Sequence, residues 1–181
     1  MNVPLADLHA QYARIKPEID SAIHDVIDRS QFVLGSAVSA FEQAFASAHG
    51  TRHCIGVGSG TDALHLALLA IGTSPGEGVI TTPFTFIAMV EAIHLAGATP
   101  IFVDVDPRTY TLDPNMLEDL LRRRGSPNAR SRGAKIRAII PVHLYGHPAE
   151  MDAIMDIALQ ERAEVLEDAC QAHLARYGGM S

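Results

Sequence analysis

The strongest constraint on the fold is an alternation, beginning after residue 52, of short apolar runs with longer segments of helical periodicity. Parallel strands need crossover connections of this length, usually helices, so the pattern predicts an α/β fold with a mainly parallel sheet and flanking helices. Five runs predict strands, at residues 53–58, 78–82, 99–105, 137–145 and 164–170. Four segments predict helices, at residues 61–70, 87–96, 114–124 and 149–162, with Gly72 and Gly97 as helix stops.

The first 50 residues have a different pattern, which predicts two helices and no strand. From Pro17, which we expect near the first turn, apolar residues recur at helical spacing to about Ser30. A second helix is expected to be capped by Ser36 and to stop at Gly50. We therefore expect an N-terminal helical segment over residues 1–50 and an α/β domain over residues 51–181.

Composition excludes several classes of protein. The chain has 181 residues, 48% of them hydrophobic, which is enough for one substantial core. Its formal net charge of −7 argues against a nucleic-acid-binding surface. No apolar stretch has the length or continuity of a signal peptide or a membrane helix, so we expect a cytoplasmic, metabolic protein.

Residue types that often form metal sites or disulfides have ordinary explanations here. Cys54 and Cys170 each lie in an apolar, strand-like run and are expected to be buried free thiols. His143 and His147 are four residues apart, but glycine and proline interrupt any shared helix face, so no metal site is expected. The basic segment 122–135 is expected to be a solvated surface loop, although such a loop can also bind anions.

A glycine-rich turn between the first predicted strand and the following helix is the first candidate site. It contains Gly58, Ser59, Gly60 and Thr61. Unpaired N–H groups at a helix N-terminus, together with the helix dipole, bind phosphate, and the two hydroxyls would add donors. The turn matches neither a Walker loop nor a dinucleotide fingerprint, so a single phosphate is expected. The alternative is that Thr61 only caps the helix and the glycines only form a tight turn.

The second candidate site is Asp168, at the end of the last predicted strand. Ligands of open α/β sheets bind beyond the carboxyl ends of the strands, so Asp168 and the glycine turn can share one ligand. A carboxylate beside a pyridine nitrogen keeps that nitrogen protonated, which makes the ring of pyridoxal phosphate (PLP) a better electron acceptor. The alternative is an ordinary cap or salt-bridge partner.

Five segments together resemble one known family. They are residues 32–35 (FVLG), 56–64 (GVGSGTDAL), 82–86 (TPFTF), 141–146 (PVHLYG) and 167–173 (EDACQAH). In this order and spacing they resemble the DegT/DnrJ/StrS nucleotide-sugar aminotransferases, within the fold type I PLP enzymes. The resemblance implies that Gly60 and Thr61, with Ser59 in the same turn, hold the cofactor phosphate, that Phe86 stacks on the ring, that Asp168 pairs with the ring nitrogen, and that Gln171 hydrogen-bonds near the ring hydroxyl. Without it, Phe86 would be assigned to the core.

The resemblance also implies an activity. The complete enzyme would use PLP to transfer an amino group, commonly from glutamate, to a nucleotide-linked keto sugar, for example in polysaccharide biosynthesis, and would be a homodimer. The lysine that binds the cofactor covalently is expected beyond the Asp168 motif, and neither Lys16 nor Lys135 occupies that position. No catalytic residue is therefore assigned in this chain, and transamination by the chain alone is not expected. A non-catalytic or decayed PLP- or sugar-phosphate-binding fragment and a PLP-family sugar dehydratase are the alternatives.

The same resemblance implies that the α/β domain is truncated and that a small C-terminal domain is absent. A truncated sheet exposes an apolar edge, so we expect the chain expressed alone to be poorly soluble. A monodisperse product that melts cooperatively would contradict this expectation.

Overall fold

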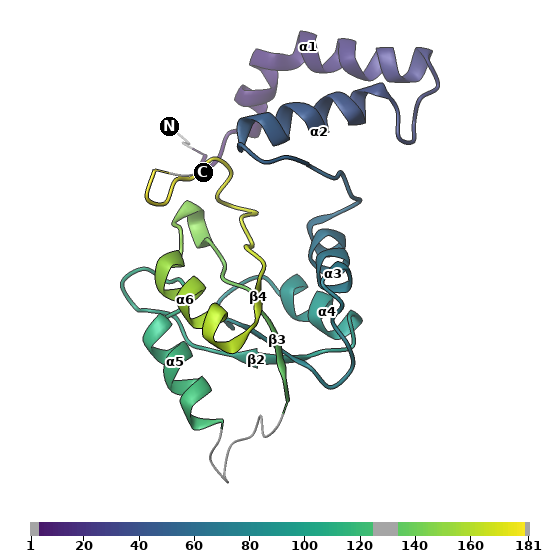
Figure 1. Cartoon of the computed structure of the whole chain (residues 1–181). Coiled ribbons are helices and arrows are strands. Elements are labelled where there is room, and N and C mark those ends of the chain that lie inside the picture. The colour runs from purple at the N-terminus through teal and green to yellow at the C-terminus, as the bar shows by residue number, and fades with distance from the viewer. Residues whose placement is uncertain (1–3, 125–133, 180–181) are drawn as a thin grey trace. The chain divides into compact units, whose positions relative to one another are not determined.

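The computed structural model describes residues 4–124 and 134–179, and the chain divides into two units, Met1–Gly56 and Val57–Ser181 (Figure 1). Each unit is described by itself. Most of the expected basic loop, residues 125–133, lies outside the described residues. No helix within the described ranges combines the length and the apolar character that crossing a membrane requires.

The first unit contains two helices, α1 (Leu8–Asp28) and α2 (Ser36–Ala48). The prediction that α1 begins near Pro17 is wrong, because Asp7 accepts a hydrogen bond from the Ala10 N–H (2.9 Å) and starts the helix earlier. Pro17 lies inside α1, where it removes one backbone hydrogen bond. Ser36 is the first residue of α2 rather than its cap, a position held by Gly35.

The second unit alternates helices and strands as the sequence predicts. In chain order it contains α3 (Gly60–Ala70), β1 (Gly78–Thr81), α4 (Ala88–Leu95), β2 (Thr99–Phe102), α5 (Pro114–Arg123), β3 (Ile136–Ile139), the 3-10 turn η1 (Leu144–Gly146), α6 (Met151–Glu161) and β4 (Glu164–Val165). The sheet has the order β2-β1-β3-β4, and every neighbouring pair is parallel. The predicted α/β fold with a parallel sheet is therefore confirmed.

Helices cover both faces of this sheet, with α3 and α4 on one side and α5 and α6 on the other (Figure 1). Successive strand side chains point to opposite faces, so Val79 packs with α3 and α4 while its neighbour Ile80 packs with α5 and α6. Ala138 and Ile139 of β3 divide in the same way. All four residues are fully buried, as expected for a parallel sheet covered on both faces.

Two predictions about the strands are wrong in detail. Residues 53–58 form no strand, and no pairing within the described residues includes them, so the backbone hydrogen bonds that define a strand are missing. The other strands are shorter than predicted, because the apolar runs continue past the ladder into the segments that carry the candidate site. The helix stops are as expected: Gly50, Gly72 and Gly97 all have positive φ angles.

Leu68 on α3 tests the layered core, because it is fully buried against α4 and the sheet whereas Leu66, two residues away, is 49% exposed. We expect Leu68→Ala to lower the free energy of unfolding by about 2–5 kcal/mol through lost burial and the cavity left behind. Leu66→Ala should change it by no more than about 0.5 kcal/mol. Urea denaturation of the two variants measures both values, and equal effects would contradict the assigned core.

Candidate active site

The start of α3 is built by Ser59, which is the N-cap residue of the helix. Its hydroxyl oxygen accepts the Asp62 N–H (3.1 Å) and donates to the Asp62 carboxylate (2.9 Å). The reading that Thr61 caps the helix is wrong, because Thr61 lies inside the first turn. Ser59 therefore fixes where the helix begins, and its hydroxyl is engaged locally.

The backbone N–H groups of Gly60 and Thr61 occupy the first turn of α3. In this position an N–H has no carbonyl partner within the helix and carries part of the positive end of the helix dipole. Gly60 has no side chain to obstruct a ligand. The geometry at these two residues suits a single anionic group such as a phosphate.

Asp168 lies three residues beyond β4, where pairing with the end of β3 continues. The Asp168 N–H donates to the Pro141 carbonyl (3.0 Å), and the His143 N–H donates to the Asp168 carbonyl (3.0 Å). Side chains alternate along this segment, because Val165 packs with the α5 and α6 side of the sheet and Leu166 packs with the α3 and α4 side. The same alternation places Asp168 on the side of α3.

Cys170 connects the two predicted parts of the site. A methyl group built on Gly60 would lie 3.5 Å from the Cys170 sulfur, so the turn after Asp168 reaches the first residue of α3. The Cys170 N–H donates to the Asp168 carboxylate (3.1 Å). Gly60 and Asp168 therefore both lie close to Cys170, at the same edge of the sheet.

The Cys170 thiol also donates a hydrogen bond to the Asp168 carboxylate, and this bond, with partial desolvation of the sulfur, raises the pKa of the thiol to about 11. Both cysteines are free, as predicted. The prediction that they are buried is wrong: Cys170 is exposed and Cys54 is half-buried. The segment around Cys170 is apolar, but it leaves the sheet before reaching this residue.

Gln171 is bound to the neighbouring turn. Its side-chain carbonyl accepts the Tyr145 N–H (2.8 Å), which joins the segment after Asp168 to η1. Tyr145 has a φ of +55°, a backbone conformation that is unfavourable for a residue with a side chain and that is often held in place at functional sites. This hydrogen bond fixes the orientation of the Gln171 amide beside Asp168.

Phe86 lies just before α4, after the carboxyl end of β1. Its side chain is 76% exposed, so the reading that it belongs to the core is wrong. An exposed aromatic ring at the ligand-binding edge of the sheet is available for stacking on a planar ligand. The described contacts do not join Phe86 to the other predicted site residues.

A hydrogen-bonded pair, the buried His143 and the partly exposed Glu167, was quoted within the sequence motifs but given no role there. The His143 ring is nearly fully buried, and its Nε2 lies 2.8 Å from the Glu167 carboxylate. This hydrogen bond lowers the pKa of Glu167. The signal in the sequence was only that both residues lie in predicted strands, residues 137–145 and 164–170.

Lys135 lies at the opposite edge of the sheet from Asp168. It immediately precedes β3, and its Nζ donates to the Glu77 carboxylate (3.0 Å) immediately before β1. Both are at the amino ends of their strands, whereas Asp168 follows the carboxyl end of β4. Lys135 therefore cannot serve as the amine of a site at Asp168. This agrees with the sequence analysis, which did not assign Lys135 as the cofactor-binding lysine.

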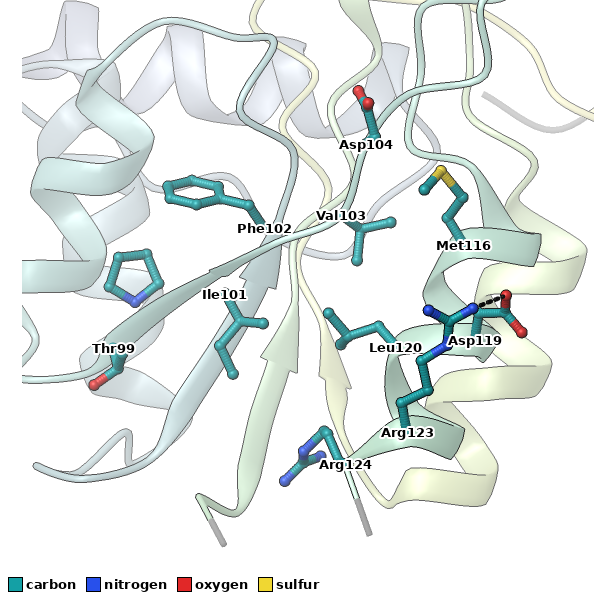
Figure 2. A pocket seen from close by; sticks show the side chains of 11 residues that line it. Thr99, Ile101, Phe102, Val103, Asp104, Met116, Asp119, Leu120, Arg123 and Arg124 are labelled. Atoms are coloured by element: carbon teal, nitrogen blue, oxygen red, sulfur yellow. Dashed lines mark hydrogen bonds and ion pairs between the residues drawn. The ribbon is translucent and has the colours of Figure 1, made fainter. Parts of the chain in front are cut away.

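A cavity of the second unit is separate from these residues. It has a volume of about 630 Å³ and lies between α5 and β2 with the residues that follow it. Figure 2 shows Ile101, Val103 and Leu120 turned toward this space, and no predicted site residue lines it. Among residues 4–124 and 134–179, no group of three or more potential ligands is arranged to hold a metal ion.

The lowered pKa of Glu167 makes stability depend on pH. Because the folded-state pKa is below the usual 4.5, the charged group stabilises the fold above that pH, and this contribution is lost as the pH falls through the folded-state pKa. Glu167→Gln keeps an acceptor oxygen but cannot titrate. Urea denaturation at neutral pH and below pH 4.5 should show a larger acid-induced loss of stability in the wild type than in Glu167→Gln. Equal losses would contradict the pairing.

Comparisons with known proteins identify the family of the chain. Residues 13–181 match the DegT/DnrJ/EryC1/StrS aminotransferase family. The "Pleiotropic regulatory protein" of Geobacillus stearothermophilus is 45% identical over 99% of this chain and 45% of its own length. The UDP-2-acetamido-2-deoxy-3-oxo-D-glucuronate aminotransferase of Pseudomonas aeruginosa is 42% identical over 98% of this chain and 46% of its own length.

The chain is also similar to a solved structure. The crystal structure of Streptomyces venezuelae DesV in complex with a ketimine intermediate has a TM-score of 0.89 and 42% identity, and the match covers 98% of this chain and 45% of that one. The chain thus spans just under half the length of the relatives it matches. The extent of these matches places the chain in the DegT/DnrJ/EryC1/StrS aminotransferase family.

Proposed function

We propose that this chain is the part of a PLP-dependent aminotransferase that binds the phosphate and the ring nitrogen of the cofactor. The observation that carries the proposal is the contact that joins Gly60, through Cys170, to Asp168. It supports a single ligand, a phosphorylated pyridine, with its phosphate at the start of α3 and its ring nitrogen at Asp168. Family membership supports the same cofactor.

The phosphate would be held by the backbone N–H groups of Gly60 and Thr61, because the first turn of α3 leaves them unpaired. The Thr61 hydroxyl can add a further donor. Ser59 was also predicted to bind the phosphate, but its hydroxyl already donates to Asp62. Its contribution would therefore be to fix the helix start, unless the hydroxyl turns toward the ligand.

The ring would be held by Asp168, Gln171 and Phe86. When bound, PLP supplies a ring that accepts electrons from the substrate carbon, and it does so best when its nitrogen is protonated. The Asp168 carboxylate would hold that proton on the nitrogen by charge and hydrogen bonding. Gln171, fixed by Tyr145, would lie beside the ring hydroxyl, and Phe86 would stack on a ring face.

The complete protein would transfer an amino group, with glutamate as the expected donor, to a nucleotide-linked keto sugar. The name of the Pseudomonas aeruginosa relative, an aminotransferase of a UDP-linked oxo sugar acid, supports this substrate class. We further propose a cytoplasmic homodimer that acts in polysaccharide or related glycan biosynthesis. The amine that binds the cofactor covalently would come from a residue other than Lys135, because Lys135 lies at the wrong edge of the sheet.

Gly60 offers a direct test of phosphate binding. Proline is favoured at the first position of a helix, and the extended backbone of Ser59 (φ −160°, ψ 167°) is compatible with a following proline. Gly60→Pro should therefore keep the fold and remove one N–H. We expect binding of pyridoxamine phosphate, followed by equilibrium dialysis, to weaken about tenfold or more, the effect of one hydrogen bond to a charged group.

Gly60→Ala is the matched control, because it keeps the N–H and adds a methyl group at an ordinary 3.5 Å contact distance from the Cys170 sulfur. It should bind nearly as well as the wild type. Pyridoxamine without its phosphate should bind all three proteins weakly and equally. Unchanged binding of pyridoxamine phosphate by Gly60→Pro would contradict the assignment of the phosphate to α3.

A further inference from the structure

We propose that His143 and Glu167 form a register lock, a positioning pair that determines which of two adjacent carboxylates, Glu167 or Asp168, faces the cofactor. This inference rests on the proposed function, because it concerns the carboxylate assigned to the ring nitrogen. His143 and Glu167 do not touch the cofactor in this proposal. They act by holding the segment that carries Asp168.

The need for a lock follows from the sheet. The last strand, β4, has only two residues, and Ala138–Glu164 and Ile139–Val165 are its pairs with β3. Side chains alternate between the two faces, so a shift of one residue would exchange the faces of neighbouring residues. Such a shift would place Glu167 on the α3 side of the sheet and turn Asp168 away from it. Backbone hydrogen bonds beyond this ladder, from the Leu166 N–H to the Ile139 carbonyl (3.1 Å) and between Asp168 and residues 141 and 143, extend the pairing to Asp168. The side-chain pair would add to this backbone register at the point where the sheet ends.

The His143 ring is fixed by two hydrogen bonds in opposite directions. Its Nδ1 accepts the Ala149 N–H (3.0 Å) just before α6, so this nitrogen carries no proton. The proton of the neutral ring is therefore on Nε2, which donates to the Glu167 carboxylate at 2.8 Å. The ring is nearly fully buried, so its two nitrogens depend on these protein partners, although the Glu167 side chain itself is about half exposed.

These bonds hold Glu167 on the α5 and α6 side of the sheet, where His143 and Ala149 lie. The backbone of His143 adds a second tie, because its N–H donates to the carbonyl of Asp168 (3.0 Å). His143 thus forms hydrogen bonds with both the side chain of Glu167 and the main chain of Asp168. The Asp168 carboxylate is left on the opposite face, beside Cys170 and the start of α3.

Two substitutions separate the two bonds of the ring. The side-chain oxygen of an asparagine reaches about as far as Nδ1. His143→Asn can therefore accept the Ala149 N–H but loses the hydrogen bond to Glu167. The side-chain nitrogen of a glutamine reaches about as far as Nε2. His143→Gln can therefore donate to Glu167 but loses the hydrogen bond from the Ala149 N–H. Glu167→Ala removes the carboxylate itself, from a side chain that is about half exposed. Glu164→Ala, on the exposed start of β4, is the charge-matched control.

The experiment uses the whole chain, in dilute solution, with pyridoxamine phosphate carrying an isotope label at its ring nitrogen. This probe has an amine in place of the aldehyde, so it does not react with lysine. Nitrogen NMR reports whether the bound ring is protonated, and a titration gives the affinity. Thermal melting of each variant is measured in parallel, because a purely structural role would change melting without changing ring protonation.

We expect Glu167→Ala and His143→Asn each to shift the bound ring nitrogen toward its unprotonated signal and to weaken binding about tenfold. The double variant should be no worse than either single one, because both remove the same interaction. His143→Gln should retain more of the protonated signal than His143→Asn. Glu164→Ala should match the wild type.

The outcomes separate the two proposals. A wild-type chain that does not bind the probe, or an Asp168→Asn variant that binds it with the ring still protonated, would overturn the proposed function. A wild type that binds a protonated ring through Asp168 while Glu167→Ala and His143→Asn do the same would overturn the register lock. Loss of melting stability in His143→Asn, with ring protonation unchanged in Glu167→Ala, would also overturn it.

Discussion

The site depends on backbone pairing that continues beyond the last regular strand. The β3–β4 ladder ends at Val165, but the Pro141 carbonyl and the His143 N–H continue it to Asp168. Without these two hydrogen bonds the pairing would end at Leu166, whose N–H donates to the Ile139 carbonyl (3.1 Å), and the Asp168 carboxylate could take many positions. With them, Asp168 stays in extended pairing until the turn that brings Cys170 to Gly60.

The local parts of this fold could be predicted from the sequence because their causes are local. Helices α3 to α6 were placed within about two residues, since apolar periodicity and glycine stops such as Gly72 and Gly97 act over a single turn. The parallel direction of the strands followed from the crossover helices. The start of α1 was predicted wrongly from Pro17, because the preference of proline for a first turn was weaker than the cap formed by Asp7.

The remaining features depend on contacts that a sequence pattern does not contain. An apolar run at residues 53–58 is not a strand unless another strand pairs with it, and none does so within the described chain. The apolar neighbours of Cys170 suggested burial, yet its position past the end of the ladder exposes it. The bond between His143 and Glu167 requires the register of β3 and β4, which is a property of the folded sheet.

The two halves of the site have opposite electrostatic character, and this restricts what can bind across them. The first turn of α3 presents unpaired N–H groups that favour an anion, whereas Asp168 favours a cation or a proton. A ligand that contacts both must carry an anionic group at one end and a basic, protonated atom at the other. A phosphorylated pyridine meets this requirement, but a simple sugar phosphate supplies only the anion. The Cys170 thiol does not disturb this pattern, because its raised pKa keeps it uncharged and able to donate to Asp168.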